Sequence, residues 1–417
     1  MRLTAPADVA AAFARRLNPC GAAPLVVALS GGSDSRALLH LTAVWAKAAG
    51  RRVLAVTVDH QLQPSSAEWT LFAAAAAAAA GADFRALSWS GPKPATGLPA
   101  AARLARHRLL AQAAREAGAT VILLGHTLDD RRESDLMRKA GSNLGELCEW
   151  SPSPVWPQGR GLFHCRPLLG VTRAALRVVL KAEAIGWIDD PANSDLRYAR
   201  ARARAALADS AAPPEPPPAR DMAEIAALAQ SWRSHDWGFS GDRADFRSAG
   251  PAKVRVLAAL LACSSGGERL PRMAKVQALA ERLSGAEAFA ASLGGARLEA
   301  DGEIRVMREA GERARGGLAP AGLPAGEALV WDGRYELTAE AAGLSVSALG
   351  GNLSRLSPAA REALRSVPAA ARRGLPAVRG GEQAVICPVL TEAVGLSFRP
   401  LMSDRLRAAC GQIAREA

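Results

Sequence analysis

A loop rich in serine and glycine has the composition of an anion-binding site. It follows the apolar run at residues 25–29 and consists of Ser30, Gly31, Gly32, Ser33, Asp34 and Ser35. The glycines allow a tight turn with exposed backbone N–H groups, the serines add hydroxyl donors, and a helix starting here would add the positive end of its dipole. No lysine follows the glycines, so the loop is not a Walker A loop. We interpret it as a phosphate-binding loop in preference to a hairpin or a plain helix cap.

Acidic residues form a second candidate site after the apolar run at residues 120–124. The segment contains His126, Asp129, Asp130 and Glu133. Asp130 and Glu133 are three residues apart, so they would share one face in the first turn of a helix. Carboxylates placed there would be aimed at the same edge of the sheet as the loop, which favours a functional role. They could also simply stabilise the positive helix end, which contributes about 0.3–1 kcal/mol for each residue.

Two further polar segments could contact a ligand. Asp59 and His60 follow the strand-like run at residues 53–58, where the alternative is a capping aspartate with an incidental histidine. A later basic stretch could bind phosphates and stack on a base, or could be a basic helix that faces solvent. Its members are Arg197, Tyr198, Arg200, Arg202 and Arg204.

Strand-like and helix-like segments alternate before residue 210 and would position these groups. The strand candidates are residues 25–29, 53–58, 84–89 and 120–124, and the helix candidates are residues 36–47, 68–80 and 100–117. Strands separated by helices of this length predict right-handed crossovers and an α/β fold with a doubly wound parallel sheet. Ligands of such sheets bind outside the carboxyl ends of the strands. The loop, Asp59–His60 and the acidic segment all follow such ends.

Two breaks divide the chain into expected domains. Residues 211–220 are proline-rich and predict a stiff linker, and a weaker Gly/Pro-rich break lies at residues 316–324. We therefore expect a catalytic domain at residues 1–210. After the linker we expect a smaller, mainly helical or mixed part, with helices at residues 221–315 and mixed α/β structure at residues 316–417.

Charge and cysteine content narrow the class of protein. The net charge is +12, most of it in residues 1–210, which favours a polyanionic partner, although a GC-rich genome would also favour arginine. Six cysteines occur singly, without a Cys-x-x-Cys pair, so we expect reduced thiols and neither zinc nor an iron–sulfur cluster. We find neither a secretory signal nor an apolar stretch of about 20 residues, and expect a cytoplasmic protein without a membrane partner.

The loop and the strand ends together resemble the tRNA(Ile)-lysidine synthase family of the PP-loop, or N-type, ATP pyrophosphatases. The resemblance rests on the Ser-Gly-Gly-x-Asp-Ser loop, Val58-Asp59-His60, the segment from His126 to Glu133, and the pattern Asp-Pro-x-Asn-x-Asp-x-x-Tyr-x-Arg at residues 190–200. It covers residues 22–205, and Arg-Arg-Gly-Leu-Pro at residues 372–376 matches short family members. It implies a PP-loop fold of the adenine-nucleotide alpha hydrolase type.

The resemblance also implies a reaction. ATP would activate carbon 2 of the wobble cytidine in an isoleucine tRNA with a CAU anticodon, and free L-lysine would then displace AMP to form lysidine. The loop at residues 30–35 would bind ATP together with Asp59, His60, His126 and Asp129. Mg²⁺ would act on the phosphates, with Asp34 as its ligand.

The remaining implied roles concern lysine and tRNA. Asp130 and Glu133 would hold the lysine substrate and Arg103 would reach its carboxylate, which with Asp34 completes the expected catalytic set. The arginine-rich stretch at residues 197–204 would bind tRNA, and residues 221–315 would make further tRNA contacts. The sequence leaves the oligomeric state open.

Several positions depart from the family pattern. Arg131 stands where the family has glutamine, and His107 replaces the tyrosine of an Arg-Tyr-Arg. Ala201 and Ala203 replace the asparagine and isoleucine of an Asn-Arg-Ile-Arg, and an expected asparagine is absent near Gly97. These departures concern the expected lysine pocket and tRNA clamp and leave the ATP loop intact.

Three other functions share parts of this pattern. A tRNA thiolase would have the same loop, but its usual paired cysteines are absent here. A small-molecule adenylating ligase would not need the arginine-rich stretch. A catalytically silent tRNA-binding protein would need neither the intact loop nor the acidic pair.

Overall fold

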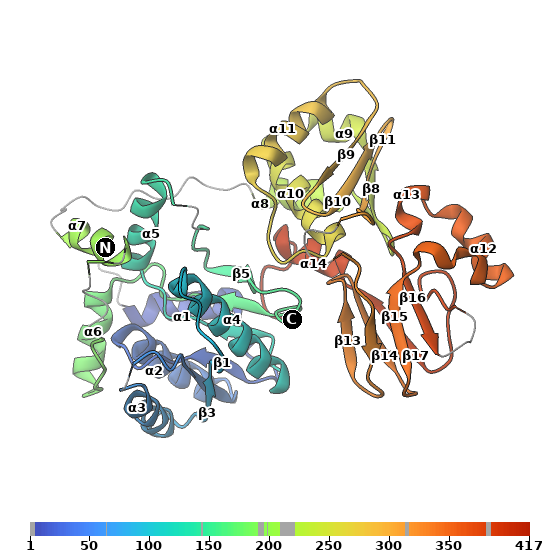
Figure 1. Cartoon of the computed structure of the whole chain (residues 1–417). Coiled ribbons are helices and arrows are strands. Elements are labelled where there is room, and N and C mark those ends of the chain that lie inside the picture. Colours follow the sequence, from blue (N-terminus) through green and yellow to red (C-terminus); the bar gives the residue numbers. More distant parts are fainter. Residues whose placement is uncertain are drawn as a thin grey trace. The chain divides into compact units, whose positions relative to one another are not determined.

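The computed structural model describes residues 5–63, 65–142, 145–190, 196–197, 199–208, 222–312, 317–380 and 385–417. The chain forms two compact units (Figure 1). The first comprises residues 1–218 together with residues 413–417, and the second comprises residues 219–412. Tyr198, the proline-rich residues 211–220 and most of the pattern at residues 190–200, namely residues 191–195, lie outside the described residues.

The first unit is built on a six-stranded sheet with the order β3-β2-β1-β4-β6-β5. Its strands are β1 Leu25–Ala28, β2 Val53–Asp59, β3 Asp83–Ser88, β4 Val121–Leu123, β5 Trp150–Pro152 and β6 Phe163–Cys165. All neighbouring pairs are parallel except β5–β6, which is antiparallel. The predicted parallel sheet is confirmed, and it gains two strands after β4 that the sequence analysis did not identify.

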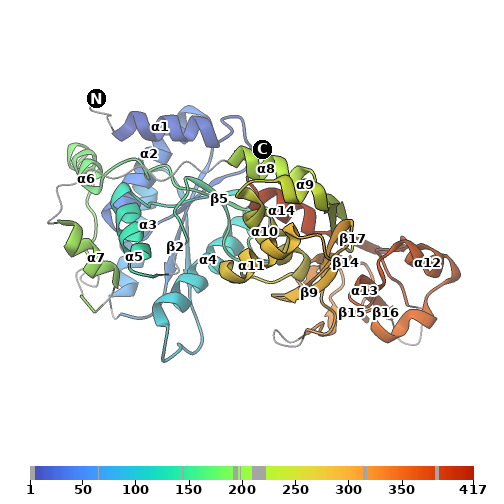
Figure 2. The same ribbon diagram turned by 90° about the horizontal axis from the view of Figure 1, so that it is seen from above.

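Helices cover both faces of this sheet. They are α1 Ala5–Arg16, α2 Ser33–Ala48, α3 Ser66–Ala79, α4 Leu98–Glu116, α5 Leu128–Lys139, α6 Arg173–Ala182 and α7 Ala199–Ala208. Leu25 and Val27 pack with apolar residues of α1, α2, α3 and α6, whereas Val26 between them packs with α4. Successive side chains of a strand point to opposite faces, which explains this division. Figure 2 shows α1 and α2 on one side of the sheet and α4 on the other.

The centre of the sheet is its topological switch point. Strand β1 pairs with β2 on one side and with β4 on the other, so the segments that follow these three strands come together at one edge. Gly125, just after β4, packs against the start of α2. A Cβ atom at Gly125 would lie 3.2 Å from the backbone of Asp34 and Ser35, so glycine permits this close approach.

The second unit combines helices with antiparallel sheets. Its first part has a five-stranded sheet, β7-β8-β11-β10-β9, and its second part has two three-stranded sheets, β12-β15-β16 and β13-β14-β17. Residues 222–308 are therefore mixed rather than mainly helical. The bounds are α8 Met222–Gln230, β7 Arg233–His235, β8 Gly238–Asp242, α9 Arg243–Ser248, α10 Ala252–Ser265, α11 Met273–Ser284, β9 Phe289–Leu293, β10 Ala296–Ala300, β11 Glu303–Arg308, β12 Ala321–Leu323, β13 Ala328–Trp331, β14 Tyr335–Ala339, β15 Leu344–Ala348, α12 Pro358–Ala363, α13 Ala369–Arg372, β16 Pro376–Gly380, β17 Leu396–Pro400 and α14 Met402–Ala409.

One hydrophobic core extends through both parts of the second unit. It joins Ile225 of α8 and Leu260 of α10 to Leu337 of β14 and Met402 of α14. Because this core contains residues from both parts, the structure gives no boundary near residue 316. The division into residues 221–315 and 316–417 therefore stays a prediction. No helix of the described residues is both long and apolar enough to cross a membrane.

Residues 413–417 belong to the first unit, although the sequence places them after the second. The carboxylate of Glu416 lies 2.6 and 2.8 Å from two guanidinium nitrogens of Arg51, and the two side chains are only 4% and 1% exposed. Glu416 also accepts a hydrogen bond from the backbone N–H of Asn18, and the indole of Trp150 donates to the carbonyl of Ile413. This segment is thus part of the structure that carries the sheet.

We expect Glu416→Gln to lower the free energy of unfolding by about 3–5 kcal/mol, because it leaves the buried Arg51 cation without its counter-charge. Urea denaturation of the full chain would measure the loss. Asp83→Asn is the matched control, since Asp83 pairs with the neighbouring Arg52 at 2.7 Å but both side chains are exposed. That change should cost less than about 1 kcal/mol. Equal losses in the two variants would show that the buried pair contributes no more than a surface pair.

Candidate active site

A cavity of about 620 Å³ opens at the carboxyl ends of β1, β2 and β4. The three polar segments that follow these strands all contribute to its wall, together with residues of α6 and α7. The polar residues that line it include Ser30, Ser33, Asp34, Ser35, Asp59, His60, His126, Asp130, Arg173, Arg177, Arg200 and Arg204. Segments far apart in the sequence therefore meet in one place.

The serine- and glycine-rich loop presents unoccupied donors to this cavity. Gly31 has a φ of 86°, and its carbonyl accepts a hydrogen bond from the N–H of Ile188. The hydroxyl of Ser35 accepts from the N–H of Ser30 and donates to the carbonyl of Gly32, which fixes the turn. Helix α2 begins within the loop, at Ser33, and no side chain in the described part of the chain caps its N-terminus. The first N–H groups of α2 are thus left to bind an anion.

Asp34 is held beside this helix end by an arginine of α6. The Nε of Arg173 lies 2.9 Å from Asp34 Oδ2, and the hydroxyl of Ser33 donates to Asp34 Oδ1. Burial raises the pKa of Asp34, an effect that Arg173 opposes and Asp130 reinforces, and the result lies above the usual range of an aspartate. Shifted pKa values of this kind cluster at functional sites, which makes Asp34 a candidate for one.

Asp130 lies in the first turn of α5, as predicted, whereas Glu133 lies in the second turn rather than the first. Asp130 has two roles. Its Oδ2 accepts hydrogen bonds from the N–H and hydroxyl of Thr127, which forms a capping box. Its Oδ1 lies 3.1 Å from Arg173 and 2.8 Å from Arg200. One oxygen therefore stabilises the helix end, while the other faces the cavity.

Glu133 lies beneath the cavity and is 1% exposed. Its two oxygens accept from Arg200 and Arg204 of α7, each at 2.8 Å, and Arg173 is 3.7 Å away. Burial would raise the pKa of Glu133, but the hydrogen bonds from Arg204 and Arg200 outweigh it and hold the pKa below its usual range. Glu133 is therefore an ionised carboxylate in a buried position.

The other members of the basic stretch lie differently. Arg202 points away from the acidic pair and donates to the carbonyls of Leu196 and Arg197, at 2.9 Å each. Arg197 is exposed. Of the basic stretch that we predicted to bind tRNA, the structure thus places Arg200 and Arg204 in the cavity wall and Arg202 outside it.

Asp129 and Arg103, which were also predicted as site residues, do not line the cavity. The carboxylate of Asp129 accepts from the backbone N–H of Arg173 at 2.7 Å, so it anchors the start of α6. Arg103 of α4 is exposed, whereas Arg106, one turn later, lines the cavity. Burial, with Arg103 and Arg200 nearby, lowers the pKa of Arg106 to about 10. No ion-pair partner of Arg106 is present in the described part of the chain, which makes it a cation open to an anionic ligand.

The histidines around Arg106 are neutral. Burial lowers the pKa of His60 and, more strongly, that of His126. His107, which replaces the tyrosine expected in this family pattern, stacks on the buried His164 with 5.1 Å between ring centroids. Burial, followed by Arg106, lowers the pKa of His107 to about 3. An imidazole carries no negative charge in either protonation state, so these histidines do not balance the charge of Arg106.

Three arginines of this site, Arg106, Arg173 and Arg177, were not predicted from the sequence. Arg173 joins the loop to the acidic pair, and the Nε of Arg177 lies 3.5 Å from the hydroxyl of Ser33. A sequence pattern could have revealed Arg173 and Arg177, because they alternate with Leu176 and Leu180 at helical spacing. The two leucines are fully buried. The four-residue spacing places both arginines on one face of α6.

Known proteins with similar sequences identify the family. Residues 6–211 match the model of the PP-loop domain. A tRNA(Ile)-lysidine synthase of Caulobacter vibrioides is 46% identical over 98% of both chains. The chain belongs to the tRNA(Ile)-lysidine synthase family. Enzymes of the same name from a Bradyrhizobium species and from Brucella ovis are 39% and 33% identical, over 62% and 91% of this chain and 79% and 86% of theirs.

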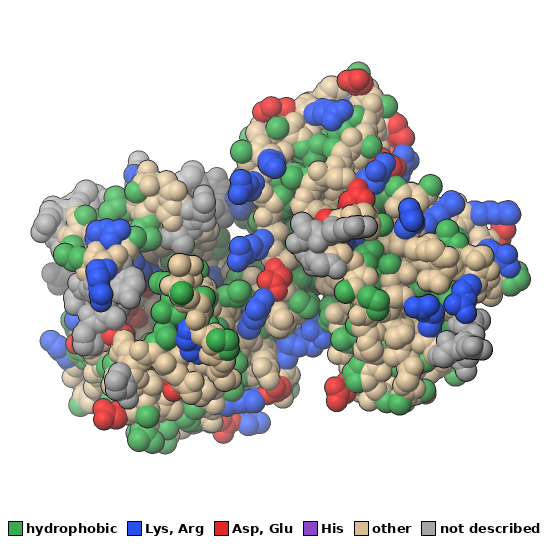
Figure 3. Space-filling model, in the orientation of Figure 1, with side chains coloured by type: hydrophobic (Ala, Val, Ile, Leu, Met, Phe, Trp, Pro, Cys, Tyr) green, Lys and Arg blue, Asp and Glu red, His purple; other side chains and the backbone are tan. Residues whose placement is uncertain are grey.

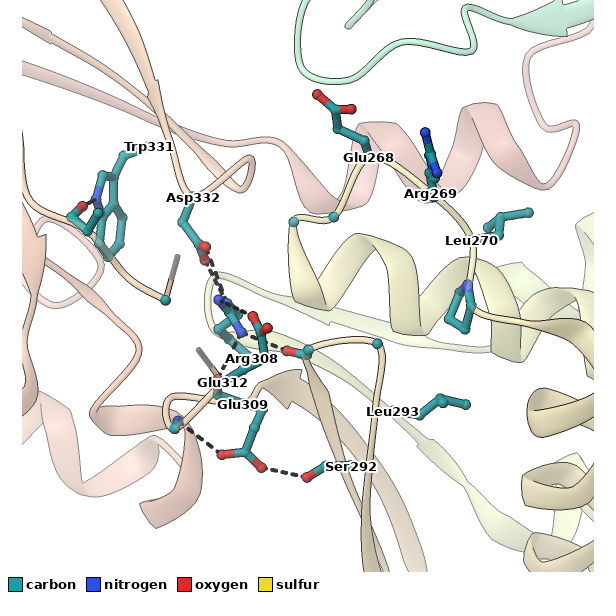
Figure 4. A pocket seen from close by; sticks show the side chains of 18 residues that line it. Glu268, Arg269, Leu270, Ser292, Leu293, Arg308, Glu309, Glu312, Trp331 and Asp332 are labelled. Atoms are coloured by element: carbon teal, nitrogen blue, oxygen red, sulfur yellow. Dashed lines mark hydrogen bonds and ion pairs between the residues drawn. The ribbon is translucent and has the colours of Figure 1, made fainter. Parts of the chain in front are cut away.

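This member of the synthase family has another cavity, of about 1090 Å³, in its second unit (Figure 4). Arg308 extends into it and is 1% exposed, and it lies 3.0 Å from Asp332 and 3.3 Å from Glu312. Arg308 also donates to the carbonyls of Gly295 and Glu309. The ion pairs and hydrogen bonds of Arg308 therefore connect β11 to the neighbouring turns. The cavity of the first unit combines a free helix N-terminus with acidic and basic side chains, and it is therefore our candidate active site.

Proposed function

We propose that this chain ligates L-lysine to carbon 2 of the wobble cytidine in an isoleucine tRNA with a CAU anticodon, with ATP converted to AMP and pyrophosphate. One observation carries the proposal: the start of α2, a site for anions, faces the same cavity as Asp130, a carboxylate that can bind a cation. The buried Glu133 lies behind this wall and contacts Arg200 and Arg204, which line the cavity. Arg173 bridges the two sites. Membership of the synthase family supports this assignment.

The first step forms an adenylated base. The oxygen on carbon 2 of the cytidine attacks the α-phosphorus of ATP, and the bond to pyrophosphate breaks. Free N–H groups of α2 and the guanidinium groups of Arg173 and Arg177 are placed to stabilise the charge that develops on the phosphates. Apolar residues in the same wall, among them Leu29, Val58 and Leu110, suit an adenine ring.

The second step forms the carbon–nitrogen bond. The side-chain amine of lysine attacks carbon 2, the carbon–oxygen bond breaks, and AMP leaves with that oxygen. The amine arrives as an ammonium ion and must lose a proton before it can attack. Asp130 and Glu133 would hold the ammonium against carbon 2, because two carboxylates in a shielded position attract a cation strongly. Arg106, and Arg103 one turn before it, would take the lysine carboxylate.

The donor set fits Mg²⁺. This ion is usually held by one or two carboxylates together with substrate phosphates and water, and Asp34 supplies a carboxylate at the phosphate loop. When bound, Mg²⁺ would neutralise charge on the phosphate oxygens. We propose that Asp34 exchanges its contact with Arg173 for this role.

The surface charge supports a polyanionic substrate. The net charge is +12, and Figure 3 shows Lys and Arg side chains spread over the visible face of both units. We propose that tRNA contacts Arg197, Tyr198, Arg200, Arg202 and Arg204, with further contacts from residues 221–315. The enzyme would act in the cytoplasm, where its three substrates occur.

The test is conversion of a tRNA transcript with a CAU anticodon. With ATP and L-lysine, the wobble nucleoside should gain the mass of one lysine less one water, and AMP and pyrophosphate should form in equal amounts. A sulfur-containing product would identify a thiolase instead. Binding of the transcript without pyrophosphate release would identify a silent tRNA-binding protein, and AMP formation that does not require tRNA would identify a small-molecule ligase.

A further inference from the structure

The carboxylates that would bind lysine already hold cations of the chain itself. Arg200 donates through Nε to Glu133 and through Nη2 to Asp130, both at 2.8 Å. Arg204 donates to the other oxygen of Glu133, also at 2.8 Å. Both oxygens of Glu133 are thus occupied by α7, a helix that lies more than sixty residues later in the sequence than α5.

The charges of this cluster are balanced without a substrate. Three guanidinium groups, those of Arg173, Arg200 and Arg204, face the carboxylates of Asp34, Asp130 and Glu133. A lysine ammonium would be a fourth cation in a shielded place, where like charges within a few ångströms repel strongly. Binding of the ammonium therefore requires that at least one arginine leaves.

The two arginines of α7 are the ones that can leave. Their side chains are 42% and 35% exposed, whereas Glu133 is almost completely buried and Arg173 is 19% exposed. Exposed guanidinium groups can form bidentate contacts with phosphate, which are among the strongest hydrogen bonds in proteins. A nucleic-acid backbone that reached α7 would thus compete with Glu133 and Asp130 for Arg200 and Arg204.

We propose that Arg200 and Arg204 occupy the amine site as internal cations, and that phosphates of the tRNA withdraw them, so that lysine is admitted only after tRNA has bound. This inference rests on the proposed function and adds an order of substrate binding to it. Without tRNA the two arginines fill the amine site, and free lysine is kept out of it. The coupling must be reciprocal, so lysine also tightens tRNA binding.

The chain offers a matched control on the same helix. Arg202 lies between the two proposed internal cations in the sequence, and within the described part of the chain its guanidinium donates to the backbone carbonyls of Leu196 and Arg197. Arg202→Gln removes one positive charge from α7 but leaves Asp130 and Glu133 paired. It separates loss of a phosphate contact from loss of the internal cation.

The experiment measures the Kd of L-lysine by titration calorimetry, without ATP, in the absence and in the presence of a saturating CAU tRNA transcript. The wild-type chain should bind lysine at least about tenfold more tightly with the transcript, which is within the usual range of coupling between sites. In Arg200→Gln/Arg204→Gln the Kd should be the same with and without the transcript, and close to the tighter wild-type value. Arg204→Gln alone should reduce the coupling partially, and it serves if the double variant does not fold. Arg202→Gln should keep the wild-type coupling.

Two outcomes would overturn the proposal. One is a wild-type lysine Kd that the transcript leaves unchanged, and the other is full coupling in the double variant. L-Norleucine, which has the lysine carboxylate but no side-chain amine, should show no coupling if the displaced cations occupy the amine site. If neither the wild-type chain nor any variant binds lysine in either state, the proposed function fails and the inference fails with it.

Discussion

Asp34→Asn is expected to lower the rate of tRNA-dependent AMP formation by about 10²–10³-fold, the usual effect of removing one electrostatic group from the reacting phosphates. The carboxylate lies at the start of α2, beside the donors that would grip pyrophosphate, and it is paired with Arg173. The amide has nearly the same shape but no charge. We therefore expect substrate binding to weaken and the adenylation step to suffer most.

The fold should survive this change. Burial, the largest influence, raises the pKa of Asp34, so its folded-state pKa lies above its unfolded-state value. Ionisation as the pH rises through that range then costs folding free energy, because the folded state binds the proton more tightly than the unfolded state. At neutral pH the uncharged Asn variant should be at least as stable as the wild type.

In the wild-type chain, AMP formation should fall as the pH is lowered through the raised pKa of Asp34.

AMP release measured by chromatography, with the melting temperature as a check on folding, would test this prediction. Asp83→Asn is the control, because Asp83 begins β3 at the opposite edge of the sheet and pairs with the exposed Arg52. That variant should keep the wild-type rate. A folded Asp34→Asn protein with wild-type AMP formation would remove Asp34 from the reaction.

Glu133→Gln is expected to raise the lysine concentration needed for half-maximal lysidine formation by about one to two orders of magnitude. A charge-assisted hydrogen bond contributes roughly 1.5–3 kcal/mol, and a neutral amide holds an ammonium far less strongly than a carboxylate does. The phosphate loop is unchanged in this variant. Pyrophosphate release that depends on tRNA should therefore largely persist, and the two half-reactions should separate.

A lysine titration at saturating ATP and tRNA, with pyrophosphate release followed in parallel, would measure both steps. Asp135→Asn is a suitable control on the same helix, because Asp135 pairs with Arg138 and does not line the cavity. An unshifted lysine curve for Glu133→Gln would mean that Glu133 only supports α5. An equal loss of both half-reactions would instead place Glu133 on the ATP side of the site.

Local sequence patterns were sufficient to predict much of the fold and of the phosphate loop in the catalytic unit. The apolar run that became β1 and the Ser-Gly-Gly loop after it predicted a strand, a turn and an anion site, because each depends on neighbouring residues only. Asp130 was placed correctly in the first turn of α5 for the same reason, while Glu133 lies one turn later than predicted. The start of α2 was not predicted correctly. The helix begins at Ser33, three residues earlier than predicted, because the end of the loop forms its first turn.

Long-range contacts were the part that the sequence could not supply. The pairing of Arg200 with Glu133 joins residues 67 positions apart, and that of Arg173 with Asp34 joins residues 139 positions apart. No periodicity or motif encodes which arginine reaches which carboxylate. Asp129 shows the reverse error, because a residue in the right motif turned out to anchor the backbone of α6. Its neighbour Asp130, in the same motif, does face the cavity.

The return of residues 413–417 to the first unit has a consequence for protein synthesis. The ribosome delivers the chain from the N-terminus at about 5–20 residues each second, and domains generally fold as units while it emerges. Here the catalytic unit lacks its partner for the buried Arg51 until Glu416 has been made, after all of the second unit. A chain cut short anywhere in the second unit would carry the complete phosphate loop but an incompletely stabilised catalytic unit. The buried ion pair between Arg51 and Glu416 can therefore form only after the whole second unit has been synthesised.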